Sequence, residues 1–211
     1  MVENKTAEKN KARRGGLNLP NTLSLVRVIL VPFFMASIIF MKEADFGIWA
    51  RLVPAILFAL TGLTDMLDGK IARKYNLVTD FGKFIDPLAD KFMVFGALIA
   101  ILTSYTYLSS LFVWVSAIVM LRELAITSLR LVVVGKSGRV IAASWWGKVK
   151  TASQIGAILL IILEPLFFGA VYNVTETPWL SWFAMLVIVV TTVGSGIDYV
   201  RAYWPDLDTN K

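Results

Sequence analysis

Four aspartates stand at helical spacing within one short stretch of the sequence. Asp65 lies three residues before Asp68, and Asp86 lies four residues before Asp90, so each pair would share one face of a helix. Two antiparallel helices joined by a short loop would point all of these carboxylates at one another. Such a cluster repels itself unless cations lie between the carboxylates, and an all-oxygen ligand set favours Mg²⁺, Mn²⁺ or Ca²⁺ over a soft metal. The spacing therefore predicts a divalent-metal site.

Small residues and one arginine accompany the aspartates. Gly69 and Ala72 lie on the first helix face and Gly82 lies on the second. Their lack of bulk would let a flat group lie against the backbone, and Arg73 adds a partner for a phosphate-sized anion. Small residues also serve close packing between membrane helices, but beside four aspartates the ligand-binding interpretation is favoured.

Cysteine and histidine are both absent from the 211 residues. Their absence excludes thiol nucleophiles, disulfides, Cys/His zinc sites and imidazole acid–base chemistry. Any catalysis must therefore rest on carboxylates, Lys, Arg, Tyr or hydroxyl groups.

The elements that must position these residues are expected to be membrane helices. The chain is 57% hydrophobic with a mean hydropathy of +0.68, which is too apolar for a soluble domain of this length. A spanning helix needs about 20 residues. The expected fold class is all-α, a single polytopic bundle of six transmembrane helices. The apolar stretches are residues 22–41, 49–68, 85–106, 108–130, 149–170 and 179–198.

The positions of Lys and Arg predict the orientation of the bundle. Six spans place both termini on one side, and the loops of the opposite side hold only Lys42 and Arg51. The positive-inside rule then places both termini in the cytoplasm. Residues 1–16 would form a flexible basic cytoplasmic arm, residues 17–204 the membrane domain, and residues 205–211 a cytoplasmic tail. Because charged groups are costly inside a membrane, the charged helix halves should face a polar chamber open to the cytoplasm.

The stretch from Asp65 to Asp90 resembles the signature of the CDP-alcohol phosphotransferase family. DMLDGKIAR followed by GKFIDPLAD matches every position of D-x2-D-G-x2-A-R-x8-G-x3-D-x3-D. The resemblance implies a multi-pass enzyme of the cell membrane that forms a homodimer, contacts the lipid bilayer, has no nucleic-acid partner, and holds two divalent cations, Mg²⁺ or Mn²⁺. It implies Asp65, Asp68 and Asp86 as metal ligands, and Asp90 as both a ligand and the base for the acceptor hydroxyl.

The resemblance also implies a binding site for the CDP group. Upstream of the aspartates, LPNTLSLVRVILVP resembles the start of bacterial phosphatidylglycerophosphate synthases, a branch of the same family. A plain helix start capped by Ser or Thr is the alternative interpretation of this segment. The residues that would contact the nucleotide are Asn21, Thr22, Arg27, Asp68, Gly69, Ala72, Arg73 and Gly82.

Two downstream segments, RELAITSLR and AASWWGKVKTASQ, also resemble that branch. They supply basic residues, which an acceptor carrying its own phosphate requires. Glycerol 3-phosphate fits this requirement, and its reaction with CDP-diacylglycerol would give phosphatidylglycerol phosphate and CMP. The same basic residues could instead be ordinary positive-inside anchors. The residues expected to bind the acceptor phosphate are Arg122, Arg130, Lys148, Arg139 and Lys150.

Other functions stay open on the sequence alone. The aspartate motif serves the donor and the metals only, so inositol phosphate, serine or phosphatidylglycerol are alternative acceptors. A divalent-cation transporter would favour a midplane site at broken helices in repeated halves, whereas no repeat is visible here. A catalytically silent scaffold gives no reason for four converging aspartates. Glu164, beside Pro165, is interpreted only as the end of the fifth span.

Overall fold

The computed structural model describes residues 19–75, 80–137 and 145–204, and it is helical apart from short connections. No strand occurs in these ranges, which agrees with the predicted all-α fold. The expected arm at residues 1–16 and the tail at residues 205–211 lie outside the described residues. The helices are α2 (Leu19–Phe40), α3 (Glu43–Phe46), α4 (Trp49–Tyr75), α5 (Asp80–Ser104), α6 (Ser109–Ser137), α7 (Trp145–Phe168) and α8 (Trp179–Tyr203), with a 3₁₀ turn, η1 (Thr106–Leu108).

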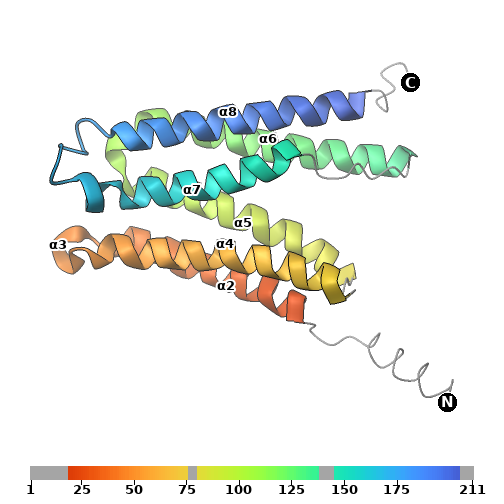
Figure 1. Cartoon of the computed structure of the whole chain (residues 1–211), viewed down its shortest axis with the longest axis horizontal. Coiled ribbons are helices and arrows are strands. Elements are labelled where there is room, and N and C mark those ends of the chain that lie inside the picture. Colours follow the sequence, from red (N-terminus) through yellow and green to blue (C-terminus); the bar gives the residue numbers. More distant parts are fainter. Residues whose placement is uncertain (1–18, 76–79, 138–144, 205–211) are drawn as a thin grey trace, which may run out of the picture.

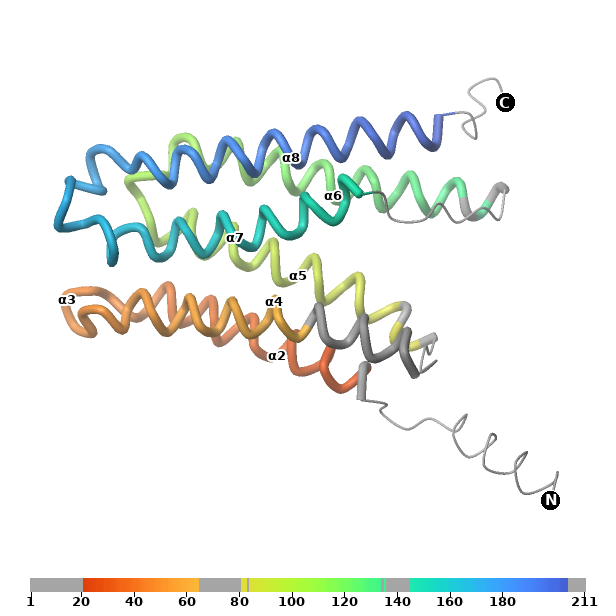
Figure 2. The backbone as a smooth tube through the Cα atoms, viewed as in Figure 1, coloured from red at the N-terminus to blue at the C-terminus, as the bar shows by residue number. Residues whose placement is uncertain are grey.

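The long helices form two groups that lie side by side (Figure 1). Helix α2 packs against α4 and α5, and α8 packs against α6 and α7, while contacts of α4 with α7 and of α5 with α6 join the groups. Helices α2 and α5 begin, and α4 and α8 end, at one end of the bundle, as the backbone trace in Figure 2 shows. We call this the aspartate end, and we call the opposite end, which carries α3 and η1, the α3 end.

The interior of the bundle is apolar and closely packed. Phe34 of α2 and Phe58 of α4 are fully buried, and their ring centroids lie 5.1 Å apart. Gly96 brings α5 close to α2, because a Cβ atom at this position would lie 2.8 Å from Cγ1 of Val31. Such a distance is shorter than packed carbon atoms tolerate. Close packing therefore fixes α5, the helix that carries Asp86, against α2.

Large apolar side chains also cover the outside of the bundle. Phe40, Trp114, Leu121 and Leu131 are each more than two-thirds exposed, which a bilayer explains and water does not. The chain is therefore a membrane protein. Within the described residues, four helical segments are long and apolar enough to cross a membrane: Asn21–Phe40, Thr106–Val133, Trp145–Phe168 and Trp179–Tyr203.

Helices α4 and α5 differ from these four because each is charged over one half. Helix α4 contains a shorter apolar segment, Trp49–Thr64, and it continues to Tyr75, beyond the predicted limit at residue 68. Helix α5 begins at Asp80, earlier than the predicted residue 85. Both helices therefore continue into charged segments, which hydropathy alone does not identify as helical. The six long helices occupy the predicted segments, while six membrane crossings stay a prediction.

Glu164 joins α7 to the start of α8. Helix α7 continues past Pro165, so the interpretation of this position as the end of the fifth span is wrong. The Glu164 carboxylate is buried and accepts hydrogen bonds from the Tyr172 hydroxyl (2.6 Å), from the amides of Leu180 (3.0 Å) and Ser181 (2.8 Å), and from the Ser181 hydroxyl. A carboxylate that accepts from the first amides of a helix satisfies groups with no partner inside the helix.

Candidate active site

Asp86 and Asp90 lie one turn apart on α5 and line the same cavity, which has a volume of about 480 Å³. Asp86 accepts a hydrogen bond of 2.5 Å from the hydroxyl of Ser24 on α2. This bond joins residues 62 positions apart in the sequence and fixes one carboxylate oxygen. The spacing of four residues has therefore produced the shared face that the sequence predicts.

The remaining predicted metal ligands lie on the neighbouring helix. Asp65 and Asp68 belong to the last turns of α4, but their side chains lie outside the described residues, as do those of Ala72 and Arg73. Among the described side chains, no group of three or more Asp, Glu, His or Cys could hold a metal ion. Asp86 and Asp90 are thus the part of the predicted cluster whose side-chain positions are described.

The predicted CDP-binding residues that are described lie on α2 and at the start of α5. Asn21 and Arg27 are almost completely buried on α2, whereas Thr22 is exposed. Gly82 is buried in the first turn of α5, one turn before Asp86. A fully buried guanidinium such as that of Arg27 is costly unless polar or anionic groups surround it. Gly69 belongs to the last turns of α4.

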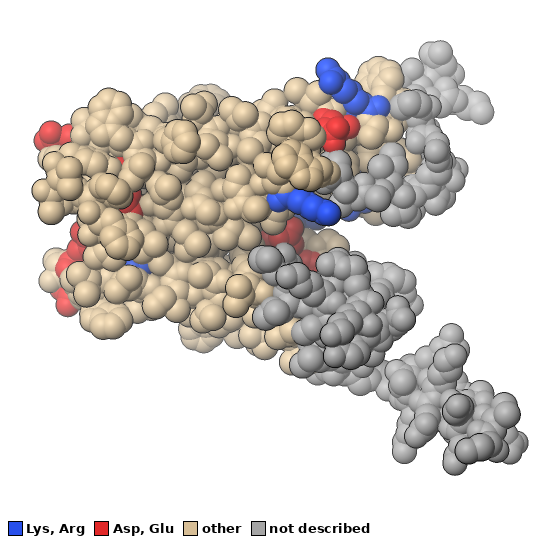
Figure 3. Space-filling model, in the orientation of Figure 1, with Lys and Arg blue, Asp and Glu red and all other residues tan. Residues whose placement is uncertain are grey.

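Four basic side chains line the cavity from the other group of helices, and we call them the basic wall. Arg122 and Arg130 come from α6, and Lys148 and Lys150 come from α7. Figure 3 shows charged atoms of both signs at the inner end of the opening between the two groups. The cavity therefore places carboxylates of α5 opposite cations of α6 and α7. Arg139 lies outside the described residues.

The members of the basic wall differ in how they are held. Arg122 donates from Nη1 to Glu123 (2.8 Å) and from Nη2 to Ser195 (2.8 Å). Lys150 forms an ion pair with the same Glu123 carboxylate. Glu123 is buried, and its negative charge reduces the repulsion between the two cations. Arg122 and Lys150 are therefore fixed within the protein, and one of their two positive charges is compensated.

Arg130 and Lys148 have no carboxylate partner among the described residues. Arg130 donates a long hydrogen bond of 3.4 Å to the Tyr199 hydroxyl, and its guanidinium lies 5.6 Å from the centre of that ring. Lys148 is exposed and makes no hydrogen bond or ion pair within the part of the chain that the structure describes. These two cations can pair with an anion that enters the cavity without losing a carboxylate partner.

Some residues that hold the cavity's charged side chains carry no motif that identifies them in the sequence. Ser24, Ser195 and Tyr199 contact Asp86, Arg122 and Arg130 from positions 62, 73 and 69 residues away. Such contacts depend on which helices become neighbours, and no local spacing predicts them. Ser24 does fall within the segment LPNTLSLVRVILVP, which is the only sequence signal that could have indicated it.

The sequence is similar to known proteins over most of its length. The family described as CDP-alcohol phosphatidyltransferase matches residues 17–194. A Bacillus subtilis (strain 168) protein named CDP-diacylglycerol--glycerol-3-phosphate 3-phosphatidyltransferase is 42% identical over 202 residues, covering 92% of this chain and 98% of the relative. A Mycobacterium tuberculosis (strain H37Rv) protein named probable phosphatidylglycerophosphate synthase is 38% identical, covering 90% and 83%. A Yersinia pestis relative with the same name as the first is 38% identical, covering 90% and 97%.

Proposed function

The chain belongs to the CDP-alcohol phosphatidyltransferase family, and we propose that it transfers the phosphatidyl group of CDP-diacylglycerol to glycerol 3-phosphate. The products are phosphatidylglycerol phosphate and CMP. Three relatives at 38–42% identity whose names carry this activity support the proposal. The single structural observation behind it is the cavity in which Asp86 and Asp90 lie opposite a basic wall.

We propose that Asp65, Asp68, Asp86 and Asp90 hold two divalent cations, Mg²⁺ or Mn²⁺. The donor set supports this, because Asp86 and Asp90 offer oxygen ligands from one face of α5 and carboxylates suit hard cations. Helix α4, which carries the other two aspartates, packs against α2, the helix that also contacts α5. When bound, the cations would neutralise the diphosphate and polarise the phosphorus under attack. EDTA should abolish CMP release, and Mg²⁺ or Mn²⁺ should restore it; full activity in EDTA would exclude the metal site.

We assign the donor's CDP group to the region beside the cavity where α2 contacts α4 and α5. Small residues there leave room for the cytidine, and cations there pair with the diphosphate. The bilayer-facing outside of the bundle suits the acyl chains. The residues proposed to contact CDP are Asn21, Thr22, Arg27, Asp68, Gly69, Ala72, Arg73 and Gly82.

The acceptor is assigned to the side of the cavity formed by α6 and α7. Its phosphate would pair with Arg130 and Lys148, with Arg122 and Lys150 as fixed neighbours and Arg139 as a further cation of this set. Asp90 lines the same cavity and is proposed to accept the proton of the attacking hydroxyl. The new bond joins that hydroxyl oxygen to the β-phosphorus of the donor, and the bond from this phosphorus to the oxygen of CMP breaks. CMP leaves as the anion.

The membrane arrangement that we propose follows from the same charges. The six long helices would cross the cytoplasmic membrane, with α4 and α5 carrying their charged halves at the aspartate end. The positive-inside rule supports a cytoplasmic location of that end and of both termini. A homodimer is proposed from the family resemblance alone.

A purified-enzyme assay tests the proposed acceptor. The protein is incubated with CDP-diacylglycerol and Mg²⁺, and CMP release is measured with glycerol 3-phosphate, inositol phosphate, serine or phosphatidylglycerol at equal concentrations. We expect glycerol 3-phosphate to give the highest kcat/KM. A higher value with any other acceptor would contradict the proposed function while leaving the family assignment intact.

A further inference from the structure

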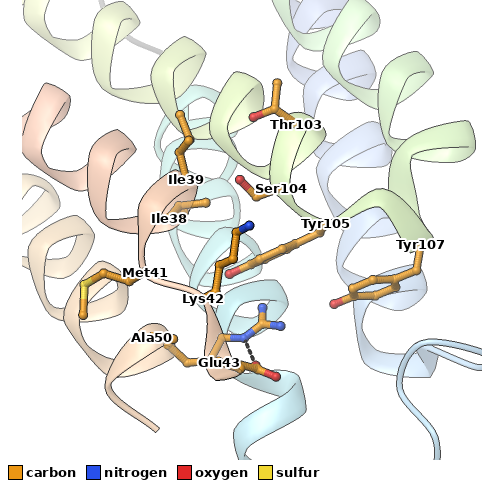
Figure 4. Close-up of a pocket in the computed structure, with 11 residues that line it drawn as sticks. Ile38, Ile39, Met41, Lys42, Glu43, Ala50, Thr103, Ser104, Tyr105 and Tyr107 are labelled. Atoms are coloured by element: carbon orange, nitrogen blue, oxygen red, sulfur yellow. Dashed lines mark hydrogen bonds and ion pairs between the residues drawn. The ribbon is translucent and has the colours of Figure 1, made fainter. Parts of the chain in front are cut away.

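A second cavity of about 400 Å³ lies at the α3 end, away from Asp86 and Asp90, and we call it the α3-end cavity (Figure 4). It is enclosed by the end of α2, the start of α4, and the connection from α5 to η1. The proposed reaction gives it no role. The polar residues that matter here are Lys42, Glu43, Arg51, Ser104, Tyr105 and Tyr107.

Arg51 is the central cation of this cavity. Its side chain is only 12% exposed, and its Nε donates to the Glu43 carboxylate. Its guanidinium lies 4.2 Å from the centre of the Tyr105 ring, a cation–π contact that fixes its plane. Its Nη1 is buried without a hydrogen-bond partner among the described residues. A rigid, desolvated donor on a permanent cation is a group that an anion would satisfy.

The other polar groups of the cavity are also mainly donors. The hydroxyl of Tyr107 is buried beside Arg51 and makes no hydrogen bond of normal geometry with a described residue. Figure 4 shows Lys42, Ser104 and Tyr105 converging on one space. Lys42 and Arg51 contribute two positive charges, and Glu43, whose carboxylate is already bonded to Arg51, contributes one negative charge. The complementary ligand is therefore an anion that offers several acceptor oxygens, as a phosphate group does.

The surroundings of the cavity favour a lipid as the source of that phosphate. Exposed apolar side chains flank it, namely Phe40, Phe46, Ile48 and Trp49, and aromatic residues at such positions are typical of the membrane interface. Arg51 also lines an adjoining cavity of about 330 Å³ that extends toward α7. An amphiphile could thus place its headgroup on Arg51 and its chains in the bilayer.

We propose that the α3-end cavity binds the phosphate of an anionic phospholipid. Phosphatidylglycerol is a suitable probe because its headgroup adds no positive charge. Phosphatidylcholine has the same phosphodiester but brings a quaternary ammonium toward Lys42 and Arg51, which like-charge repulsion disfavours. The proposal is independent of the transferase reaction.

Because the chain has no cysteine, a single engineered cysteine reports on the cavity alone. In the purified full chain, Ser104→Cys is alkylated with a maleimide in detergent that contains phosphatidylglycerol, phosphatidylcholine or inorganic phosphate. At a phosphatidylglycerol concentration ten times its Kd, we expect labelling to slow by about tenfold, following the ratio of lipid to Kd. The control is Ser110→Cys, an exposed position at the same end that does not line the cavity, where no lipid should change the rate.

Substitutions in the Ser104→Cys background identify the groups that hold the phosphate. Arg51→Gln should abolish the protection. Tyr107→Phe removes only a hydroxyl and should weaken the protection, so it provides a test even if the Arg51→Gln variant fails to fold. Glu43→Gln should strengthen it, because the competing carboxylate loses its charge. CMP release should be unchanged in Tyr107→Phe, so failure here is distinguishable from failure of the transferase assignment.

Three results would overturn the proposal. The first is equal protection by phosphatidylcholine, and the second is protection by phosphatidylglycerol that survives both Arg51→Gln and Tyr107→Phe. The third is protection by inorganic phosphate without any by phosphatidylglycerol, which would make the ligand a free anion.

Discussion

Glu123 is the carboxylate near the basic wall whose replacement by glutamine should destabilise the protein most. The Glu123 side chain is 11% exposed and pairs with Arg122 and Lys150, which are 12% and 7% exposed. Hydrogen bonds to charged groups are worth about 1.5–3 kcal/mol each. Arg122 and Lys150 both donate to the same oxygen, Oε1, so glutamine can keep that acceptor, but both bonds lose their charged partner and become weaker.

The expected cost is about 3 kcal/mol, in the range typical of breaking a buried ion pair. For a chain of this size, that corresponds to a fall in the apparent unfolding midpoint of about 6–12 °C. The assay is thermal unfolding of the purified protein in one detergent, with Glu176→Gln as the matched control, because Glu176 is exposed on the loop before α8. Equal midpoints for the two variants would refute the reasoning that Glu123 compensates the two cations.

Three further substitutions test other parts of the structure. Asp90→Asn should lower turnover by about 10²–10⁴-fold while CDP-diacylglycerol binding persists; parallel loss of donor binding would make Asp90 a ligand only. Lys148→Gln should raise KM for glycerol 3-phosphate by about 10–100-fold, because one charge-assisted bond is lost. Lys42→Gln at the α3 end is the control and should leave KM unchanged; equal effects of the two substitutions would show that Lys148 is not part of the acceptor site. Gly96→Ala should destabilise the bundle by about 1–3 kcal/mol through overpacking, while Gly156→Ala, which meets open space, should not; unchanged unfolding of both would contradict the close contact of α2 with α5.

The helices follow from the sequence because apolar runs of membrane length are a strong local signal. Their charged ends are less predictable: α5 begins at Asp80, not at residue 85, since a polar helical turn does not differ in hydropathy from a loop. Glu164 shows the same limit, because a carboxylate beside Pro165 looks like a helix end until α8 supplies amides to it.

In the candidate site, too, the sequence predicts some features and not others. Asp86 and Asp90 face one cavity because the spacing within a helix determines their shared face. The contact of Ser24 with Asp86 and that of Arg130 with Tyr199 depend on packing between distant helices, which one sequence does not specify. The pairing of Lys150 with Glu123 could not be predicted either, because the sequence shows only that Glu123 follows Arg122.

We propose that the basic wall recognises a phosphate on the acceptor, while the carboxylates across the cavity serve the reaction. The most direct measurement compares CMP release from CDP-diacylglycerol and Mg²⁺ with glycerol 3-phosphate and with free glycerol, which presents the same hydroxyls without the phosphate. We expect a kcat/KM for glycerol 3-phosphate at least 10²-fold higher, in line with about two charge-assisted bonds to Arg130 and Lys148. Comparable values for the two acceptors would show that the basic wall does not recognise the phosphate.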